Sequence, residues 1–497
     1  MTSAFILLLP ILLPLVGGLY IPVAKFRSRR WREVYIFFVV MATSLLALAA
    51  VIWCPADNLT LLRFSGTMSI AFRLDGLGRV FALMVAFLWP VATVYAFEYM
   101  KHEGKELKFY TFYTMTFGVT LAIAFAANLL TMYLFYELLT FITLPLVIHA
   151  MNRTVYAAGK KYLFYSIGGA TLVFICLVFT ANYGTSLDFA LGGVFTPEML
   201  AENRQALLWV FFLAFIGFGV KAAIFPFHSW LPAASVAPTT VTALLHAVAV
   251  VKAGAFTTMR LTYYIFGSEN VAGTWVQKAV MALAIITILY GSAKAFYMQH
   301  FKRRLAYSTV SQLSYVLFGV TLMTAKGLAA SIFYMVAHGF MKILLFYCCG
   351  SVLYMPRRTD VGQLEGLGSY MPVTFGTFTV GALALMGLPL TIGFNAKLEL
   401  LLAAVSAGYG QAGTLGFVGI GVILISILLT AAYLFTIIRS AYFPREESVS
   451  FEPDRLPRDP NWKMKGPLIL LAVTVILLGI FSQPLWEYVT AISLGMV

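Results

Sequence analysis

Long apolar runs alternate with short polar segments along the whole chain. A membrane-spanning helix needs about 20 mainly apolar residues, and no polar segment between the runs is long enough for a soluble domain. The pattern therefore predicts an all-α polytopic membrane protein with about fourteen transmembrane helices. The runs are Phe5–Val23, Val34–Trp53, Gly76–Phe97, Phe109–Ala126, Leu129–His149, Tyr162–Thr180, Leu207–Ile224, Thr239–Phe266, Val271–Tyr297, Leu305–Thr324, Leu328–Met355, Val373–Ala404, Leu415–Arg439 and Pro467–Leu494.

Two of these predicted helices, the seventh and the twelfth, contain helix-breaking residues. The seventh runs into Phe225–Pro232, which holds two prolines, and the twelfth contains Gly387–Gly393 with Pro389. Proline removes a backbone donor and clashes with the preceding turn. Such breaks are common kinks in membrane helices, but breaks at matching places in two halves of a transporter mark its transport site. A lysine beside each break favours the second interpretation, and the five-helix separation fits a repeat of five helices.

The composition excludes a water-exposed surface. Of the 497 residues, 61% are hydrophobic and 11% are charged, whereas soluble proteins carry about a quarter charged residues. The net charge of +14 would suit a nucleic-acid binder, but the basic residues lie in short loops between apolar runs. None of the four cysteines, Cys54, Cys176, Cys348 and Cys349, has the spacing of a metal or cluster site. The sequence therefore predicts a lipid environment, no nucleic-acid partner, no metal and no cofactor.

Positive charge alternates from loop to loop. Because basic residues mark the cytoplasmic side, the alternation predicts that both termini face outside a cell (inner) membrane, and it favours fourteen helices over thirteen or fifteen. The other loops hold only Arg63, Arg73, Arg204 and Lys326, with Arg260 and Lys278 at helix ends. The basic loops hold Lys25, Arg27, Arg29, Arg30 and Arg32; Lys101, Lys105 and Lys108; Arg153, Lys160 and Lys161; Lys302, Arg303 and Arg304; Arg357 and Arg358; and Arg439, Arg445, Arg455, Arg458, Lys463 and Lys465.

Several ionisable residues lie inside the predicted helices, where a charge costs about 2.5–3.5 kcal/mol. Some have plain structural explanations: Lys294 and Lys342 can extend to the headgroups, His246 can be a hydrogen-bonded core residue, and Asp75 suits the positive end of a helix. His338 and Lys342 are four residues apart and share a helix face. The candidate proton-translocation residues are Glu137, Lys221, Lys252, His338, Lys342 and Lys397, with His228, His246 and Glu399 as secondary candidates.

Proton transfer is the chemistry that these residues support. A buried lysine can change charge near neutral pH, and a nearby carboxylate stabilises its protonated form. Glu137 with Lys221 is the natural pair of this kind, and Lys252, His338 and Lys397 extend a polar path from it.

Four motifs resemble those of antiporter-like subunits, which occur in respiratory complex I, Mrp-type sodium/proton antiporters and membrane-bound energy-converting hydrogenases. The resemblance covers most of the chain, and the length matches the medium-sized members, including the Mrp D-type subunit. The motifs are Lys221–Pro232 with Pro238, Val241 and Ala243–His246; Tyr136-Glu137-Leu138; Lys302–Ser308 with Ser311-Gln312; and Gly387–Pro389 with Gly393–Lys397.

The resemblance implies two inverted five-helix repeats with broken helices 7 and 12. It implies that Glu137 and Lys221 are the glutamate–lysine pair of the first half-channel, Lys252 a connecting lysine, His338 a central-axis residue and Lys397 the terminal lysine. The implied organisation is 1–108 for helices 1–3, 109–266 for the first repeat, 267–440 for the second, and 441–497 for a loop and helix 14.

The function expected from both lines of argument is ion translocation within a larger membrane complex, with protons as the ion and sodium exchange left open. The expected partners are other membrane subunits, including further antiporter-like ones. The alternative is a structural scaffold of a redox complex, which should have lost such costly charges. An independent carrier of an organic solute would need more polar groups at mid-membrane. A catalytic site in the chain itself is not expected, because no nucleotide loop or cluster ligand set is present.

Overall fold

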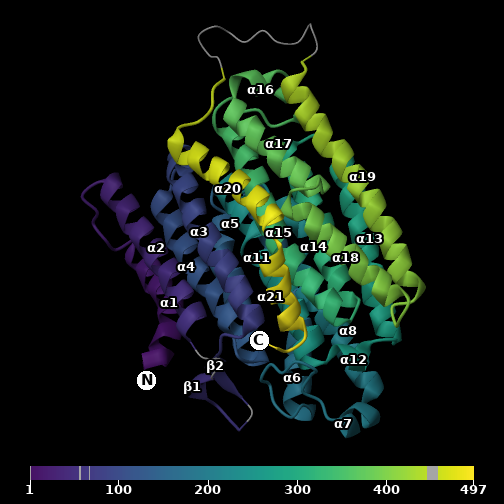
Figure 1. The fold of residues 1–497 in the computed structure, drawn as a ribbon. Helices are drawn as coiled ribbons and strands as arrows, with labels where there is room; N and C mark the ends of the chain where they lie inside the picture. Colours follow the sequence, from purple (N-terminus) through teal and green to yellow (C-terminus); the bar gives the residue numbers. More distant parts are fainter. Residues whose placement is uncertain (1, 55–57, 67, 445–456, 497) are drawn as a thin grey trace.

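The fold is a bundle of long helices, seen in a computed structural model that describes residues 2–54, 58–66, 68–444 and 457–496 (Figure 1). Within these residues, ten helical segments are long and apolar enough to cross a membrane. The elements are α1 (Thr2–Tyr20), α2 (Arg29–Trp53), β1 (Leu59–Arg63), β2 (Ser69–Phe72), α3 (Gly76–Glu103), α4 (Glu106–Phe125), α5 (Leu129–Val147), α6 (Arg153–Tyr183), α7 (Pro197–Glu202), α8 (Arg204–Lys221), α9 (Trp230–Ala234), α10 (Thr239–Ala247), α11 (Val250–Met259), α12 (Ser268–Val271), α13 (Trp275–Tyr297), α14 (Phe301–Thr321), α15 (Ala325–Tyr354), α16 (Leu367–Tyr370), α17 (Pro372–Met386), α18 (Ile392–Gly408), α19 (Thr414–Tyr442), α20 (Trp462–Ile480) and α21 (Gln483–Ser493).

Each predicted apolar run corresponds to one helix or to a pair of helices, and the multi-pass membrane architecture is confirmed. The count of fourteen spans and the inverted repeats remain predictions. Both expected interruptions are present: α8 ends at Lys221 before the short helix α9, and residues 387–391 separate α17 from α18. Arg445 and Arg455, two of the loop charges behind the topology prediction, lie outside the described residues.

The eighth predicted helix was expected to be continuous, but the structure shows it interrupted. It divides into α10 and α11, and a wider-turned stretch follows from Arg260 to Ile265. The backbone N–H groups of both Val248 and Ala249 donate to the carbonyl of Leu244, at 3.2 and 3.0 Å. Because two N–H groups share one acceptor, the regular helical hydrogen-bond pattern is interrupted here. No proline or glycine lies at this point, so the sequence contains no signal for the break.

A short β-hairpin also departs from the all-helical expectation. Strand β1 pairs antiparallel with β2, with Leu59 opposite Phe72 and an irregularity between Thr60 and Leu62. Hydrogen bonds from Arg73 N to Phe125 O (2.7 Å) and from Ala127 N to Ala71 O (3.0 Å) attach the hairpin to the end of α4. Its backbone groups are therefore satisfied partly by the bundle itself.

Two basic residues that the topology argument counted as loop charges are buried. Lys302 and Arg304 lie in the first turn of α14 and are 6% and 3% exposed. Lys302 Nζ donates to the carbonyl of Ala237, and Arg304 donates to the carbonyls of Met298 and Tyr433 at 2.7 and 2.9 Å. The basic loop after the ninth predicted helix is therefore shorter than expected, because α14 begins at Phe301 rather than Leu305.

A buried ion pair joins α3 to the stretch that follows α11. Asp75 caps α3 by accepting from Gly78 N at 3.0 Å and binds the guanidinium of Arg260 through both carboxylate oxygens. Arg260 is 1% exposed, and its guanidinium carbon lies 4.7–5.1 Å from three aromatic ring centres. The structural role expected of Asp75 fits this geometry.

Replacing Arg260 with methionine should destabilise the protein strongly. The change leaves the Asp75 carboxylate without its counter-ion, and breaking a buried pair from one side costs about 3–5 kcal/mol. Thermal unfolding of the solubilised protein measures the effect, and Arg204→Met, at an exposed arginine of α8, is the matched control. An Arg260→Met protein that unfolds at the same temperature as Arg204→Met would show that the pair carries no stability.

Candidate functional site

The first part of the candidate site lies where α8 ends against α5. Lys221, the last residue of α8, is fully buried, and its Nζ donates to the carbonyl of Tyr136 and lies 3.3 Å from the centre of the Tyr136 ring. Glu137 is the next residue and is half-buried, with Oε1 buried and without a hydrogen-bond partner. The two charges interact electrostatically, but no ion pair joins these two described side chains. The structure thus brings the predicted pair together through Tyr136 rather than by direct contact.

Two neighbouring contacts fix the position of Lys221. The indole of Trp230, in α9, donates to the carbonyl of Val220 at 2.7 Å, at the end of α8, where the same carbonyl accepts from Ala223 N at 3.0 Å. On the other side, a Cβ added to Gly254 would lie 2.5 Å from the backbone nitrogen of Ala222. The absence of a side chain at Gly254 therefore lets α11 approach the end of α8 directly.

The centre of the bundle holds a lysine–histidine pair. Lys252 on α11 and His338 on α15 are fully buried, and Nζ of the lysine is hydrogen-bonded to Nδ1 of the histidine. The other ring nitrogen of His338, Nε2, is buried without a partner. Lys252 lies just beyond the break between α10 and α11. At this break the carbonyl of Ala247 faces Gly339, and a Cβ added to Gly339 would lie 3.3 Å from that carbonyl oxygen. The predicted connecting lysine and central histidine are thus in direct contact.

Lys342 continues this group along α15 and does not extend to the headgroups, since it is fully buried. Its Nζ donates to the carbonyl of Leu305 at 3.2 Å and to Ser308 Oγ at 2.6 Å. His246 on α10 is fully buried within electrostatic range of Lys342, with its ring centre 4.8 Å from that of Phe346.

Lys397 lies across the break in the twelfth segment. It belongs to the second turn of α18, and its Nζ donates to the carbonyls of Leu385 and Met386, at 2.6 and 3.0 Å. These are the last two residues of α17, whose carbonyls have no helical partner and carry the negative end of the helix dipole. Gly387, with φ of 94°, turns the chain away from α17. The break therefore provides the acceptors for the buried lysine.

The other two candidates lie at the edge of this group. Glu399 is half-buried on α18 and interacts electrostatically with the exposed Lys326, so it faces away from Lys397 as the helical period requires. His228 lies between α8 and α9 against the rings of Phe225 and Tyr290, at 5.7 and 4.6 Å. Neither of the two contacts the central group.

A set of polar side chains that the sequence analysis did not assign begins at Lys342. Ser308 Oγ, which accepts from Lys342, lies 2.8 Å from the hydroxyl of Tyr433 on α19. That hydroxyl is 3.3 Å from Thr430 Oγ1, and Thr430 in turn accepts from Gln312 Nε2 at 3.4 Å. All of these groups are buried.

The same set reaches the surroundings of Lys397. The hydroxyl of Tyr334 donates to Gln312 Oε1, its ring centre is 5.4 Å from that of Tyr315, and the Tyr315 ring centre is 5.9 Å from Lys397 Nζ. We call the connecting residues the hydroxyl chain: Ser308, Tyr433, Thr430, Gln312, Tyr334 and Tyr315. It links the two lysines through hydrogen bonds, one pair of tilted rings and the contact of Lys397 with the Tyr315 ring.

Part of this chain had a signal in the sequence. Ser308, Gln312 and Tyr315 follow one another at helical spacing on one face of α14, and the first two belong to a motif that carried the resemblance but received no role. Lys302 belongs to the same motif and lies within electrostatic range of His246. Tyr433 and Thr430 had no signal, because only the packing of α19 places them there.

Comparison with known proteins agrees with this architecture. The family described as NADH:quinone oxidoreductase/Mrp antiporter, TM, matches residues 126–423. The NADH-quinone oxidoreductase subunit N of Desulforudis audaxviator is 28% identical over 426 residues, with 83% of this chain and 82% of that protein covered. The Na(+)/H(+) antiporter subunit A1 of Staphylococcus aureus (strain JH9) is 29% identical over 437 residues, and the chain spans about half (53%) of its length.

Two solved structures have the same fold. A chain of the Mrp complex from Dietzia sp. DQ12-45-1b superimposes with a TM-score of 0.86 and 22% identity, covering 100% of this chain and 98% of that one. A chain of the membrane-bound sulfane sulfur reductase, an archaeal respiratory membrane complex, gives 0.83 and 22%, with 98% and 97% covered. The resemblance seen in the motifs is thereby confirmed, and the chain belongs to the NADH:quinone oxidoreductase/Mrp antiporter transmembrane family.

Proposed function

We propose that this chain is an ion-translocating membrane subunit of a multi-subunit complex of the Mrp antiporter, membrane-bound hydrogenase or complex I type, and that it moves protons. One observation carries the proposal. Lys221, Lys252, Lys342 and Lys397 are all buried, and none of them forms an ion pair with a carboxylate in the described part of the chain. Arg260, by contrast, is buried with Asp75 as its counter-ion.

The presence or absence of a carboxylate partner distinguishes a charged residue with a structural role from one that exchanges a proton. A buried charge without a partner is expensive, and such groups respond by giving up or taking on a proton. Arginine stays charged, so it needs its carboxylate, whereas a lysine can release its proton in the protein interior. A scaffold subunit has no need to keep four buried lysines in this condition.

The proposed path follows the buried groups. It begins at Lys221 with Glu137 in the first repeat, 109–266, and reaches Lys252 and His338 at the centre. From Lys342 it follows the hydroxyl chain to Lys397 in the second repeat, 267–440. Proton transfer between hydrogen-bonded groups needs donor and acceptor within about 2.6–3.2 Å, directly or through one water. The bonds of Ser308 with Lys342 and with Tyr433, at 2.6 and 2.8 Å, meet this condition directly, and the wider links of the path require water.

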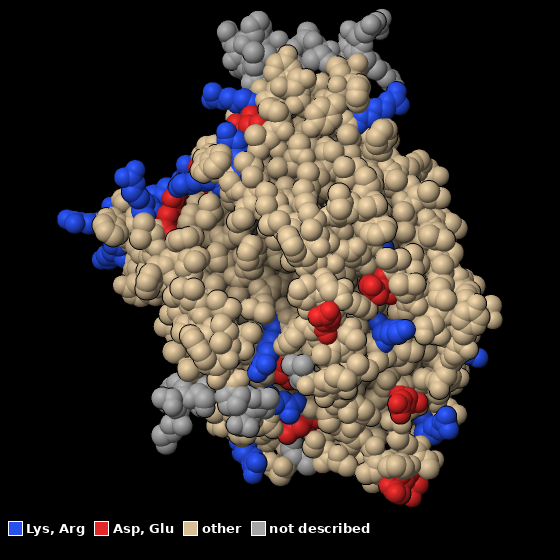
Figure 2. All heavy atoms as spheres, in the orientation of Figure 1, with Lys and Arg blue, Asp and Glu red and all other residues tan. Residues whose placement is uncertain are grey.

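The proposed orientation in the membrane has both termini outside an inner membrane. Figure 2 supports it, because Lys and Arg at the upper end have few acidic neighbours, whereas those in the lower half are interspersed with Asp and Glu. Both chain ends lie in the lower half (Figure 1). Other membrane subunits, including antiporter-like ones, are the proposed partners. A second question is whether the chain exchanges sodium for protons. The similarity to a Na(+)/H(+) antiporter subunit raises this question.

Proton flux through the reconstituted complex tests the proposal. Lys252→Met should reduce flux at least about 100-fold, the typical contribution of a positioned proton-transfer group, while the complex stays assembled. Lys294→Met, at an exposed lysine of α13, is the matched control and should leave flux unchanged. Repeating the measurement with and without a sodium gradient separates exchange from proton movement alone. Equal flux in Lys252→Met and wild type would favour the scaffold function.

A further inference from the structure

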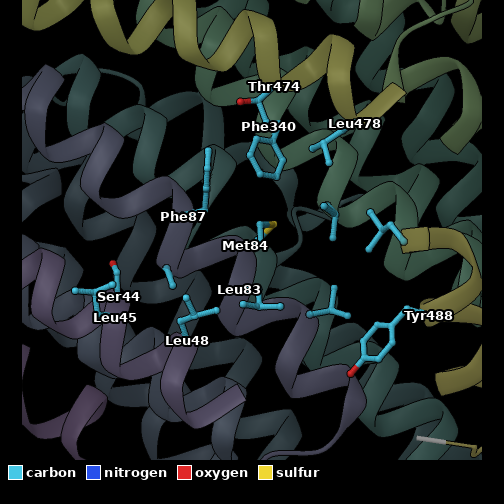
Figure 3. Close-up of a pocket in the computed structure, with 14 residues that line it drawn as sticks. Ser44, Leu45, Leu48, Leu83, Met84, Phe87, Phe340, Thr474, Leu478 and Tyr488 are labelled. Carbon is cyan, nitrogen blue, oxygen red and sulfur yellow. The ribbon is translucent and has the colours of Figure 1, made fainter. Parts of the chain in front are cut away.

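An interhelical groove runs down the membrane-facing side of the bundle between α2 and α20, with α3 as its floor. Its upper cavity, of about 600 Å³, is lined by the α2 residues Val34, Phe37, Phe38 and Met41 and by α3 and Lys463. A lower cavity of about 480 Å³ continues on the same helices, and Figure 3 shows its almost entirely carbon lining. The lining of the lower cavity includes Ser44, Leu48, Met84, Phe340 and Leu478.

The upper end of the groove is positively charged. Arg30 lines it, is exposed and has no ion-pair partner within the described residues. Lys463 lies opposite on α20, where it shares the carboxylate of Glu33 with Arg29. Glu106 pairs with Arg29 and with Arg32. Arg30, Lys463 and Glu33 line the groove itself, and Arg29, Arg32 and Glu106 lie behind them. A net positive charge therefore remains over the end of α2, where Figure 2 shows basic side chains together.

Exposed tryptophans place this end at the membrane surface. Trp31 follows Arg30, Trp462 precedes Lys463, and both are exposed. Tryptophan concentrates at the boundary between headgroups and hydrocarbon. The cationic end of the groove therefore lies at headgroup depth, and the apolar walls below it lie in the hydrocarbon.

The length of the upper cavity matches one leaflet. From Arg30 to Met41 the helix rises eleven residues, about 16 Å, and half of a bilayer hydrocarbon core is about 15 Å. A chain that starts beside Arg30 thus reaches the middle of the membrane inside the cavity. The lower cavity, on Ser44–Leu48 of α2, begins where this chain ends.

From this geometry we propose that the groove is a binding site for a phospholipid with an anionic headgroup. The headgroup phosphate binds Arg30 and Lys463, and an acyl chain lies against Val34, Phe38 and Met41. The residual positive charge selects anionic over zwitterionic headgroups, because each basic residue near a membrane surface strengthens the binding of anionic lipid about fivefold. The site is independent of ion translocation.

Lipid titration of the delipidated complex tests the proposal. Dioleoyl phosphatidylglycerol should bind and raise the unfolding temperature more than dioleoyl phosphatidylcholine, which has the same chains. The double variant Arg30→Gln/Lys463→Gln should weaken phosphatidylglycerol binding about 25-fold, from two charges at about fivefold each. The charge-matched control Lys25→Gln/Arg27→Gln, at exposed residues outside the groove, should bind like wild type. Met41→Trp narrows the groove at unchanged charge and should weaken both lipids.

Three results would overturn the proposal. The first is equal binding of the two lipids by wild type, which would mean that the headgroup is not recognised. The second is unchanged phosphatidylglycerol binding by the double variant. The third concerns the complex in native membranes: a photo-crosslinker at Phe38 that captures a neighbouring subunit, and no lipid, would show that a protein helix occupies the groove.

Discussion

Lys221→Met should abolish proton movement by a complex that is otherwise intact. The lysine lies where α8 ends, bound to the carbonyl of Tyr136 and in the field of Glu137, and no other described lysine shares this position. Methionine fills a similar volume but carries no proton. Loss of a positioned proton-transfer group costs about 10²–10⁴-fold, so flux should fall at least about 100-fold. Proton uptake by proteoliposomes measures it, with native gels to verify assembly.

Two further variants make this experiment specific. Glu137→Gln keeps the shape of the side chain but removes the charge that stabilises the protonated lysine, so flux should fall as well. Lys278→Met, at an exposed lysine of α13, makes the same substitution away from the path and should have no effect. Normal flux in an assembled Lys221→Met or Glu137→Gln complex would rule out the pair as the first step.

The second large effect should come from Lys397. Its ammonium group both occupies the break and satisfies the carbonyls of Leu385 and Met386. Lys397→Ala would leave these buried acceptors unpaired, at a cost of about 1–3 kcal/mol, so lost flux could reflect lost structure. Lys397→Gln separates the two roles, since its amide can donate to the same carbonyls but carries no exchangeable charge. We expect an assembled, stable Lys397→Gln complex without proton flux.

Glu399→Gln is the comparison for this variant. Glu399 is half-buried and faces Lys326, so its loss should weaken flux only slightly. Flux measured beside the unfolding temperature gives both readouts for each protein. If Lys397→Gln transports like wild type, or if Glu399→Gln is the variant that stops transport, the terminal position of Lys397 in the path is wrong.

Burial was predictable for Lys252, because a charge near the middle of an apolar run is too costly to face lipid. An apolar run alone does not bury its lysines, since Lys294 lies in the run Val271–Tyr297 and is exposed. The breaks beside Lys221 and Lys397 had signals in proline and glycine. The break between α10 and α11 had none, since a shared acceptor at Leu244 interrupts a run of ordinary helix-forming residues. The burial of Lys302 and the position of Tyr433 depend on how distant helices pack, and local patterns carry no information on that packing.

The hydrogen bond between Lys252 and His338 limits how the path is occupied. A bond between these two nitrogens needs one donor and one acceptor, and with both groups charged no acceptor remains. While this bond is intact, the pair therefore holds one excess proton at most, and a second proton enters only after the first has left. On the proposed path, protons would then cross the centre one at a time, so throughput could not exceed the rate at which a proton leaves this pair.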